Sequence, residues 1–492
     1  MTPLLARIHA LRNRQSWIQL LTIGLLLAGV WGIAFVMSKY GMAAGLAVAC
    51  APGVLLYLGC SIQRPIYALA GLFVVNYFIM GLTRFMHGAP IGLLLDGLIF
   101  YNFFVMILHS LYHKIEWRRA LTWLTLLAFV WMLYGAMELF NPQTVSATGW
   151  FSSVRSISFH FFFIVVLGQI LLDDYRYLRY MLYIWSVLTL LAVAKALIQK
   201  YIGFSDTELY WLYVLEYSTT HIIGSGVRYF SFFSDAANFS ASMGMALVVF
   251  AIVAIYFRNL WTKGYFMAVA MLAGYAMLIS GTRSALAIPF VGFMVYILLS
   301  KQVRIFILGS VLLVGAFCFL NYTYIGQGNA VIRRARSAFN PNDRSLVVRL
   351  ENQQKLRVIM ADKPFGAGIG HGGGKAKIFA PDAPLSQIPT DSWLVQIWVE
   401  TGVVGLVSHL LILFVVLGFG GFQVMFRLQH RQLRGVIASF TAGIAGVVAM
   451  SYANEILGQL PMGVILYLCM TFIALSPELD RKLTLAGVDK NE

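Results

Sequence analysis

The chain has 492 residues, of which 60% are hydrophobic and only 11% are charged. Soluble domains average about 45–50% apolar and about 25% charged residues, so this composition excludes a soluble enzyme, a disordered regulator and a disulfide-stabilised scaffold. The formal net charge is +16. That excess would suggest nucleic-acid binding in a soluble protein, but in so apolar a chain it is better explained by basic residues that anchor helices on the cytoplasmic side.

Apolar windows along the chain predict an all-α polytopic membrane protein with about fourteen transmembrane helices, in a range of about twelve to fourteen. The expected spans are residues 16–37, 41–61, 65–82, 91–112, 120–140, 156–173, 177–199, 234–257, 264–281, 284–300, 304–323, 394–420, 435–453 and 457–476. They divide the chain into four parts, which are the helices of 1–323, a large loop at 324–393, the helices of 394–476 and a tail at 477–492. All four cysteines lie in apolar stretches and are interpreted as packing residues.

The distribution of lysine and arginine predicts the orientation of these helices. With a cytoplasmic N-terminus, the short inside segments hold 19 of the 36 basic residues and the short outside segments hold 6; the others lie in the long loop and at Lys195. Basic residues favour the cytoplasmic side of short loops, whereas long loops are exempt from this bias. We therefore expect both termini inside, an uncleaved first span, and residues 324–393 on the external, periplasmic side.

The external loop is long for a connection, and such loops are usually functional. Its middle, residues 345–361, is predicted to form an amphipathic helix in which Leu346, Leu350, Leu356 and Ile359 share one face.

Six ionisable residues lie within or beside the predicted spans. They are Asp96, Lys195, Asp235, Arg283, Glu400 and Glu455. Charged groups at membrane depth are costly and usually functional. In the orientation above, each lies near the external end of its helix, whereas an alternating-access transporter tends to hold such groups near the midplane, within repeated halves. The one-sided pattern favours a cavity that opens to the external face and is covered by the long loop.

Three arginines come from three different external elements. Arg228 precedes an aromatic-rich helix entry, Arg283 lies in a tight turn, and Arg349 lies in the predicted loop helix. Because a guanidinium group matches phosphate oxygens in a bidentate fork and always stays charged, these arginines predict a polyanion clamp. A pyrophosphate leaving group requires charge stabilisation of this kind.

Residues 366–374 are rich in glycine, but no strand–turn–helix context makes them a dinucleotide-binding fingerprint. We expect a turn that lets the backbone approach a ligand, in which His371 is either a proton acceptor or a solvated residue. Asp173 and Asp174 resemble half of a metal site but lie among arginines on the predicted cytoplasmic side. No His, Cys and Asp spacing supports a metal site, so the sequence predicts neither a metal nor another cofactor.

Together these patches resemble the O-antigen ligase/polymerase superfamily of bacterial envelope glycosyltransferases, over roughly residues 220–410. The residues that carry the resemblance are Arg228, Arg283 in its Ser-Arg turn, Asp343, Ser345 and Arg349 at the start of the loop helix, Pro364, Gly366, Gly368 and Gly370 in a proline–glycine motif, and Asp391, Ser392, Glu400, Gly402 and Gly405 in the final element. The resemblance rests on the order and spacing of these patches and on their location on the same, external side of the membrane.

Ligases of this family typically carry a histidine where this chain has Asp391. A carboxylate at that position is more similar to the polysaccharide polymerase branch, so the resemblance favours a polymerase. His371 could replace the ligase histidine from another position, which keeps the ligase interpretation open. A lipid-linked glycan flippase or exporter is a third alternative, but it needs a polar route through the whole bilayer, and the predicted cytoplasmic half holds almost no ionisable groups.

The resemblance implies a GT-C-like membrane fold and a metal-independent glycosyl transfer at the external face of the bacterial inner membrane. The donor would be an oligosaccharide repeat unit on undecaprenyl pyrophosphate. The acceptor would be a sugar on a second lipid-linked repeat unit, giving O-antigen or exopolysaccharide, or lipid A-core or a protein in the case of a ligase. The implied partners are the lipid bilayer and chain-length regulator or flippase proteins, with no nucleic acid.

Chemistry then assigns roles as hypotheses. Arg228, Arg283 and Arg349 hold the pyrophosphate and stabilise it as it leaves, and Asp391 accepts the proton of the attacking hydroxyl. The other expected substrate contacts are His371, Asp235, Tyr229, Phe232, Trp393 and Glu400. The aromatic residues among them serve either as walls of the site or as membrane-interface aromatics.

Overall fold

The computed structural model describes residues 29–32, 34–39, 41–85, 92–215, 218–223, 226–339 and 344–486. Its strands β1 (Ile222–Ile223) and β2 (Gly226–Val227) are short and pair antiparallel. Contacts divide the chain into two units, Met1–Tyr67 and Ala68–Glu492, and every candidate site residue lies in the second.

The structure is otherwise built from helices. The α-helices are α2 (Met42–Gln63), α3 (Ile66–Leu82), α4 (Gly92–Ser110), α5 (Trp123–Met137), α6 (Ala147–Val154), α7 (His160–Leu171), α8 (Tyr175–Tyr201), α9 (Asp206–Tyr213), α10 (Ser218–His221), α11 (Ala236–Tyr256), α12 (Leu260–Ile279), α13 (Ala287–Leu299), α14 (Val303–Tyr322), α15 (Ala330–Arg336), α16 (Arg344–Ile359), α17 (Gly373–Phe379), α18 (Trp393–Phe422), α19 (Arg431–Ser451) and α20 (Met462–Leu485). Short 3₁₀ segments are Trp117–Ala120, Glu138–Phe140, Arg283–Leu286, Ser337–Phe339 and Pro384–Gln387, and Arg155–Phe159 and Gln423–Arg427 are π-helical.

Ten of the described helices are long and apolar enough to cross a membrane, and three shorter apolar helices accompany them. Each predicted span from 41–61 onward coincides with one of these helices, whereas the first, 16–37, falls largely outside the described residues. The all-α polytopic class is therefore confirmed. The number of spans and the GT-C-like arrangement stay predictions.

Two boundaries of the last helix differ from the prediction. Helix α20 begins at Met462 rather than at residue 457, because Pro461 lacks an amide hydrogen and is suited to the very start of a helix rather than its interior. The chain between α19 and α20 is therefore a connection, and Glu455 lies in that connection instead of in a span. At its other end α20 continues to Leu485, with Pro477 inside it.

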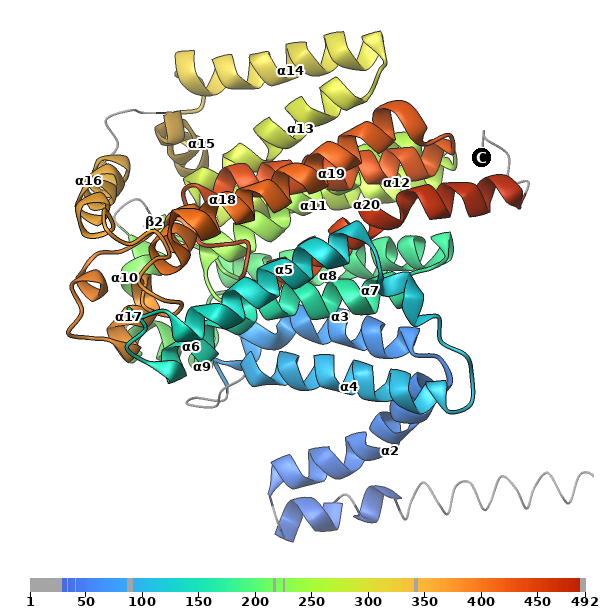
Figure 1. Ribbon diagram of the computed structural model, residues 1–492. Helices are drawn as coiled ribbons and strands as arrows, with labels where there is room; N and C mark the ends of the chain where they lie inside the picture. The colour runs from blue at the N-terminus through green and yellow to red at the C-terminus, as the bar shows by residue number, and fades with distance from the viewer. Residues whose placement is uncertain are drawn as a thin grey trace, which may run out of the picture. The chain divides into compact units, whose positions relative to one another are not determined.

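The core of the second unit lies around α11, α19 and α20, whose apolar windows are each 83% buried. Helix α11 packs on α12 and α19, and α13 packs on α19 (Figure 1). Gly446 allows that last contact, because a Cβ there would lie 2.5 Å from the carbonyl oxygen of Ile288. Helix α14 contrasts with this core, since none of the residues in its described apolar window is buried.

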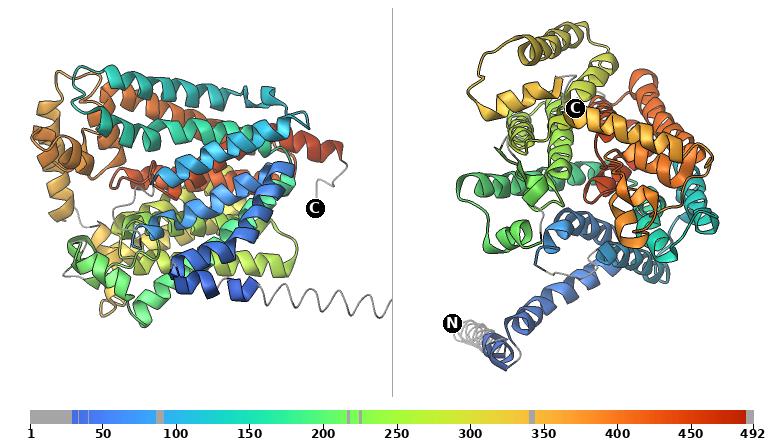
Figure 2. Two further views of the ribbon diagram at one scale, coloured as in Figure 1. Left: turned by 90° about the horizontal axis from the view of Figure 1, so that it is seen from below. Right: turned by 90° about the vertical axis from the view of Figure 1, so that its left-hand side faces the viewer.

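Short helices and connections gather at one end of the long helices. Figure 1 shows α6, α9, α10, α16 and α17 at this end, on the left, while α20 ends at the opposite side. The right-hand view of Figure 2 looks onto the same end. The loop helix predicted at 345–361 is present there as α16.

Helix α16 confirms the predicted element but not the whole of its predicted apolar face. Leu356 is buried, and Ile359 packs against Val399 and the residues around it. Leu350 is instead 45% exposed. Arg349, the preceding residue, is instead partly buried, so the inward face of α16 includes positions 346, 349, 353, 356 and 360.

The orientation inferred from basic residues leads to a labelling prediction. In a variant without the native cysteines, Asp382→Cys in the exposed loop should react with an impermeant thiol reagent in intact spheroplasts. Arg118→Cys, exposed at the other end of α4 and α5, should react only after lysis. The opposite labelling pattern would show that the loop is cytoplasmic and would contradict the predicted orientation.

Candidate functional site

A cavity of about 490 Å³ lies at the loop end of the helices and is lined by four arginines from four elements. Arg228 follows β2, Arg283 opens a 3₁₀ turn, Arg334 lies in α15, and Arg349 lies in α16. Within the described part of the chain, no Asp or Glu is among the residues that line this cavity. The cavity, called the arginine pocket below, therefore suits an anion with several oxygens, such as a phosphate or pyrophosphate group.

The turn between α12 and α13 places two of these arginines. Arg228 Nη2 donates to Thr282 Oγ1 at 2.9 Å, next to Arg283 in the sequence. Gly281 has a φ of 67°, and a Cβ at this position would lie 3.0 Å from Arg334 Cζ. Only a glycine fits this turn easily, because the left-handed backbone and the close guanidinium both oppose a side chain.

The arginines also affect each other electrostatically. Burial, followed by the charges of Arg228 and Arg283, lowers the pKa of Arg334 to about 10. Burial likewise lowers the pKa of Arg228, and Arg283 and Arg349 add to this effect while Asp235 opposes it. Arg334 still carries its charge at neutral pH, so a bound polyanion would relieve the repulsion. Clustered, perturbed groups of this kind are typical of binding sites.

An apolar cavity of about 660 Å³ adjoins the arginine pocket. Helices α11, α12, α13 and α14 supply most of its side chains, and Leu286 and Phe290 line both cavities. The combination of a cationic chamber and a continuous apolar groove suits an amphiphile with an anionic head and a long apolar chain.

The turn that carries Asp391 lies beside one wall of the arginine pocket. Trp393 N donates to the carbonyl oxygen of Asn454 at 3.2 Å, and Thr390 Oγ1 donates to Glu455 Oε1. Asn454 itself lines the pocket. Asp391, exposed between these contacts, is therefore close to the pocket without lining it.

Glu455 and Asp391 form a pair of neighbouring carboxylates. Burial raises the pKa of Glu455, and the charge of Asp391 adds to this effect. Lys375 faces Glu455 from α17, and burial lowers the pKa of its ammonium group. This polar cluster beside the arginine pocket can accept or share a proton.

The proline–glycine motif docks onto a break in α18. Gly402 interrupts the helix with φ 69° and ψ −173°. Ala367 N donates to the carbonyl oxygen of Val399 at 2.8 Å, and Gly368 N donates to that of Glu400 at 3.1 Å. The loop thus satisfies carbonyl groups that the break releases from the helix ladder. The two glycine motifs of the sequence are two halves of one interlocked structure.

Comparison with known proteins finds a family that is similar to this region. Residues 268–410 match the domain family described as O-antigen ligase. No curated protein matches the chain. The domain includes Arg283, Arg334, Arg349, Asp391 and Gly402, so the resemblance to the O-antigen ligase/polymerase superfamily is confirmed over this region.

The conformation of Gly402 gives a stability prediction for the matched region 268–410. A Cβ at Gly402 would lie 2.0 Å from the carbonyl oxygen of Pro364, in a backbone conformation that L-residues disfavour. We expect Gly402→Ala to lower the free energy of unfolding by ~1–3 kcal/mol and to lower the melting temperature in detergent. Gly418→Ala, in the same helix, is the control, because no described atom lies within 4 Å of its Cβ. Equal melting temperatures for the two variants would contradict the docking of the proline–glycine motif onto the break in α18.

Two expected substrate contacts, Glu400 and Asp235, have structural surroundings instead. Glu400 is fully buried, Gln396 Nε2 donates to its Oε1 at 3.3 Å, and its side chain lies against Gly372 of the glycine loop. Asp235 is the N-cap of α11, where its Oδ1 accepts from Ala237 N and Asn238 N. Asp235 therefore shapes the start of a helix, and its charge favours the charged form of Arg228.

His371 is neither solvated nor positioned as a base. It is 3% exposed, and its Nε2 accepts hydrogen bonds from Val145 N at 3.1 Å and Ser146 N at 3.0 Å. Its Nδ1 lies 3.2 Å from the carbonyl oxygen of Ile369, to which it must donate. Both ring nitrogens are thus occupied, and burial lowers the pKa of the imidazole. The neutral ring ties the glycine loop to the start of α6.

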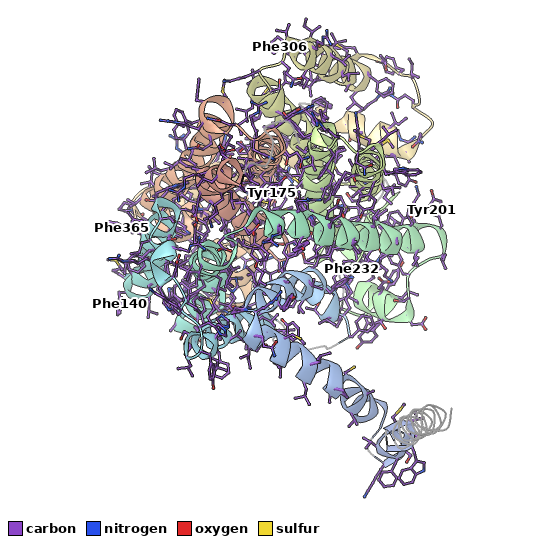
Figure 3. All side chains as sticks on the ribbon, turned by 90° about the vertical axis from the view of Figure 1, so that its right-hand side faces the viewer. Phe140, Tyr175, Tyr201, Phe232, Phe306 and Phe365 are labelled. Atoms are coloured by element: carbon purple, nitrogen blue, oxygen red, sulfur yellow. The ribbon has the colours of Figure 1, made fainter. Side chains whose placement is uncertain are left out.

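The aromatic residues expected as walls pack elsewhere. Tyr229 stacks on Phe204 with ring centroids 6.2 Å apart. Phe232, which is labelled in Figure 3, packs against Phe78 of α3 with ring centroids 4.8 Å apart. Trp393 is buried, and its Nε1 donates to His409 Nε2 at 3.1 Å. Among the described residues that line the arginine pocket, none of these three aromatic side chains occurs.

The remaining ionisable residues of the predicted external set are paired structurally. Asp96 bonds His160 Nε2 at 2.6 Å and also pairs with Arg155. Lys195 pairs with Glu208 at 3.0 Å. Asp343 lies outside the described residues, as does the side chain of Ser345.

Sequence reasoning missed Arg334 and Asn454 as pocket residues. Arg334 is one of three arginines in α15, and the sequence gives no signal that distinguishes it from Arg333 or Arg336. Asn454 lies in the short connection between the predicted spans 435–453 and 457–476, where no motif marks it. Only the packing of α15 and of the α19–α20 connection against the turn at Gly281 reveals both residues.

Proposed function

We propose that this chain is a membrane glycosyltransferase that polymerises polyprenyl-pyrophosphate-linked oligosaccharide repeat units into a surface polysaccharide. The observation that carries the proposal is the arginine pocket joined to an apolar groove. The pocket suits the pyrophosphate, and the groove suits the prenyl chain. We place the reaction at the external face of the inner membrane, with both termini cytoplasmic, in agreement with the basic-residue count.

In the proposed reaction, the hydroxyl oxygen of the acceptor sugar bonds to the anomeric carbon of the donor sugar. The bond between that carbon and the pyrophosphate oxygen breaks, and the polyprenyl pyrophosphate leaves with the electron pair. Arg228, Arg283, Arg334 and Arg349 would stabilise the charge that develops on the leaving group. Asp391 would take the hydroxyl proton. In other reactions with a pyrophosphate leaving group, a metal ion supplies positive charge. Here the arginines can supply it, which supports a metal-independent mechanism.

A ligase that transfers a finished glycan to another acceptor is the second candidate. The description of the matched domain, O-antigen ligase, favours it. Asp391 favours the polymerase, because ligases resembling this chain carry a histidine there. His371, which would have to replace that histidine, has both ring nitrogens engaged.

The deciding experiment incubates purified full-length protein with lipid-linked repeat units as both donor and acceptor. A ladder of products with increasing length is expected for a polymerase. A single transfer, which occurs only when lipid A-core or a protein acceptor is added, would identify a ligase. The absence of both, with folded protein and an authentic donor, would contradict a glycosyltransferase.

A further inference from the structure

Arg84 is a buried arginine that the sequence pattern did not single out. It lies just beyond α3, is 2% exposed, and follows an apolar helix in what was predicted to be an external turn. Within the described residues, no carboxylate lies at ion-pair distance from it. Burying such a cation is costly unless its hydrogen-bond donors are used, so the contacts of Arg84 require an explanation.

Its guanidinium group holds the backbone of the segment that carries Arg228. Arg84 Nη1 donates to the carbonyl oxygen of Ser231 at 2.7 Å, and Nη2 donates to that of Phe233. The guanidinium carbon also lies over the rings of Phe230 and Trp211, 4.3 and 4.8 Å from their centroids. A buried cation above aromatic faces gains cation–π stabilisation, which offsets part of its desolvation.

A second buried side chain, Gln199 of α8, holds the same segment. Gln199 Oε1 accepts from Ser231 N at 2.8 Å, and Gln199 Nε2 donates to the carbonyl oxygen of Ser231 at 3.1 Å. Ser231 needs this support, because its φ of 53° is unfavourable for a residue other than glycine. Residues 230–233 are therefore held, with a strained backbone at Ser231, by two side chains that do not line the arginine pocket.

Arg228 lies two residues before this held segment, and the other arginines of the pocket repel it. Arg283 and Arg349 both destabilise the charged form of Arg228. A flexible segment would let Arg228 move away from the other arginines, and the pocket would lose one of its four cations. We propose that Arg84 is a positioning residue that keeps Arg228 in the arginine pocket and so preorganises it for a pyrophosphate group; this inference rests on the proposed function.

The test measures the affinity of inorganic pyrophosphate for the purified full-length protein in detergent by calorimetry. We expect Arg84→Gln to weaken binding by at least about tenfold, which corresponds to about 1.4 kcal/mol. Arg84→Lys should lie between Arg84→Gln and the wild type, because one ammonium group cannot reproduce a planar fork. Asn102→Leu is the control. It removes a buried side chain that donates to the carbonyl oxygens of Ala68 and Leu98, away from this segment, and should leave affinity unchanged.

A double-mutant cycle separates positioning from general destabilisation. If Arg84 acts through Arg228, then Arg84→Gln should weaken binding by less than about twofold in an Arg228→Ala background. Additive losses, or an unchanged affinity in Arg84→Gln, would overturn the inference. If Arg84→Gln does not fold, the same cycle is run with Arg84→Lys and judged by the same criterion.

The outcomes also separate this inference from the proposed function. Weaker binding in Arg228→Ala with wild-type affinity in the Arg84 variants would leave the pyrophosphate pocket in place and remove only the role of Arg84. Unchanged affinity in Arg228→Ala would overturn both.

Discussion

Arg283→Lys is expected to lose about 10²-fold in transfer rate although it keeps the positive charge. Arg283 lines the arginine pocket, and its Nη1 donates to Ser337 Oγ at 3.4 Å. A planar guanidinium can hold this hydroxyl with one edge and two phosphate oxygens with the other. Lysine offers a compact point charge on a flexible stem and cannot do both.

The measurement is the initial rate of transfer from a lipid-linked donor at equal amounts of folded protein. Arg333→Lys is the matched control, since Arg333 lies in neighbouring α15, is exposed and donates to the carbonyl oxygen of Gln327 outside the pocket. The control should keep its activity. Full activity in Arg283→Lys at normal protein levels would reduce Arg283 to an anchor at the membrane interface.

The convergence of Arg228, Arg283 and Arg349 was predictable from the sequence, because topology alone places all three on one side of the membrane. The helices were predictable for a similar reason, since long apolar runs in a membrane leave few alternatives to a helix. Arg334 and Arg84 were not predictable. One lies among equivalent arginines in α15, and the other is buried where α9 and the segment after β2 contact it.

Family motifs also do not separate residues that touch a ligand from residues that shape the backbone. Glu400, Gly402 and the proline–glycine motif occur together because they interlock, and His371 joins this structure to α6. A residue that binds the ligand and a residue that shapes the backbone can both belong to a family motif. Only the hydrogen-bond partners, which come from distant segments, distinguish a positioning role from a catalytic one.

The side chain of the motif residue Asp391 forms no hydrogen bond with the backbone within the described part of the chain. The N-cap of α18 is Ser392, whose Oγ accepts from Val395 N at 3.4 Å, so Asp391 is not needed to start the helix. Its φ of 48° lies in the left-handed region. Asparagine and aspartate tolerate that region better than most residues, so Asp391→Asn leaves the turn intact where an alanine would strain it.

We expect Asp391→Asn to lower the rate of transfer by about 10²–10⁴-fold while leaving the affinity for the lipid-linked donor nearly unchanged. The amide keeps the shape of the side chain but cannot take the proton of the acceptor hydroxyl. Rate and donor affinity are measured separately on the same preparation, with Asp382→Asn, an exposed acid of the same loop, as the control. A rate within about threefold of wild type, far from the loss that removal of a general base causes, would exclude this role. The proton acceptor would then be sought at Glu455, whose partly buried carboxyl group lies beside Asp391 and whose pKa is raised by burial and by the charge of Asp391.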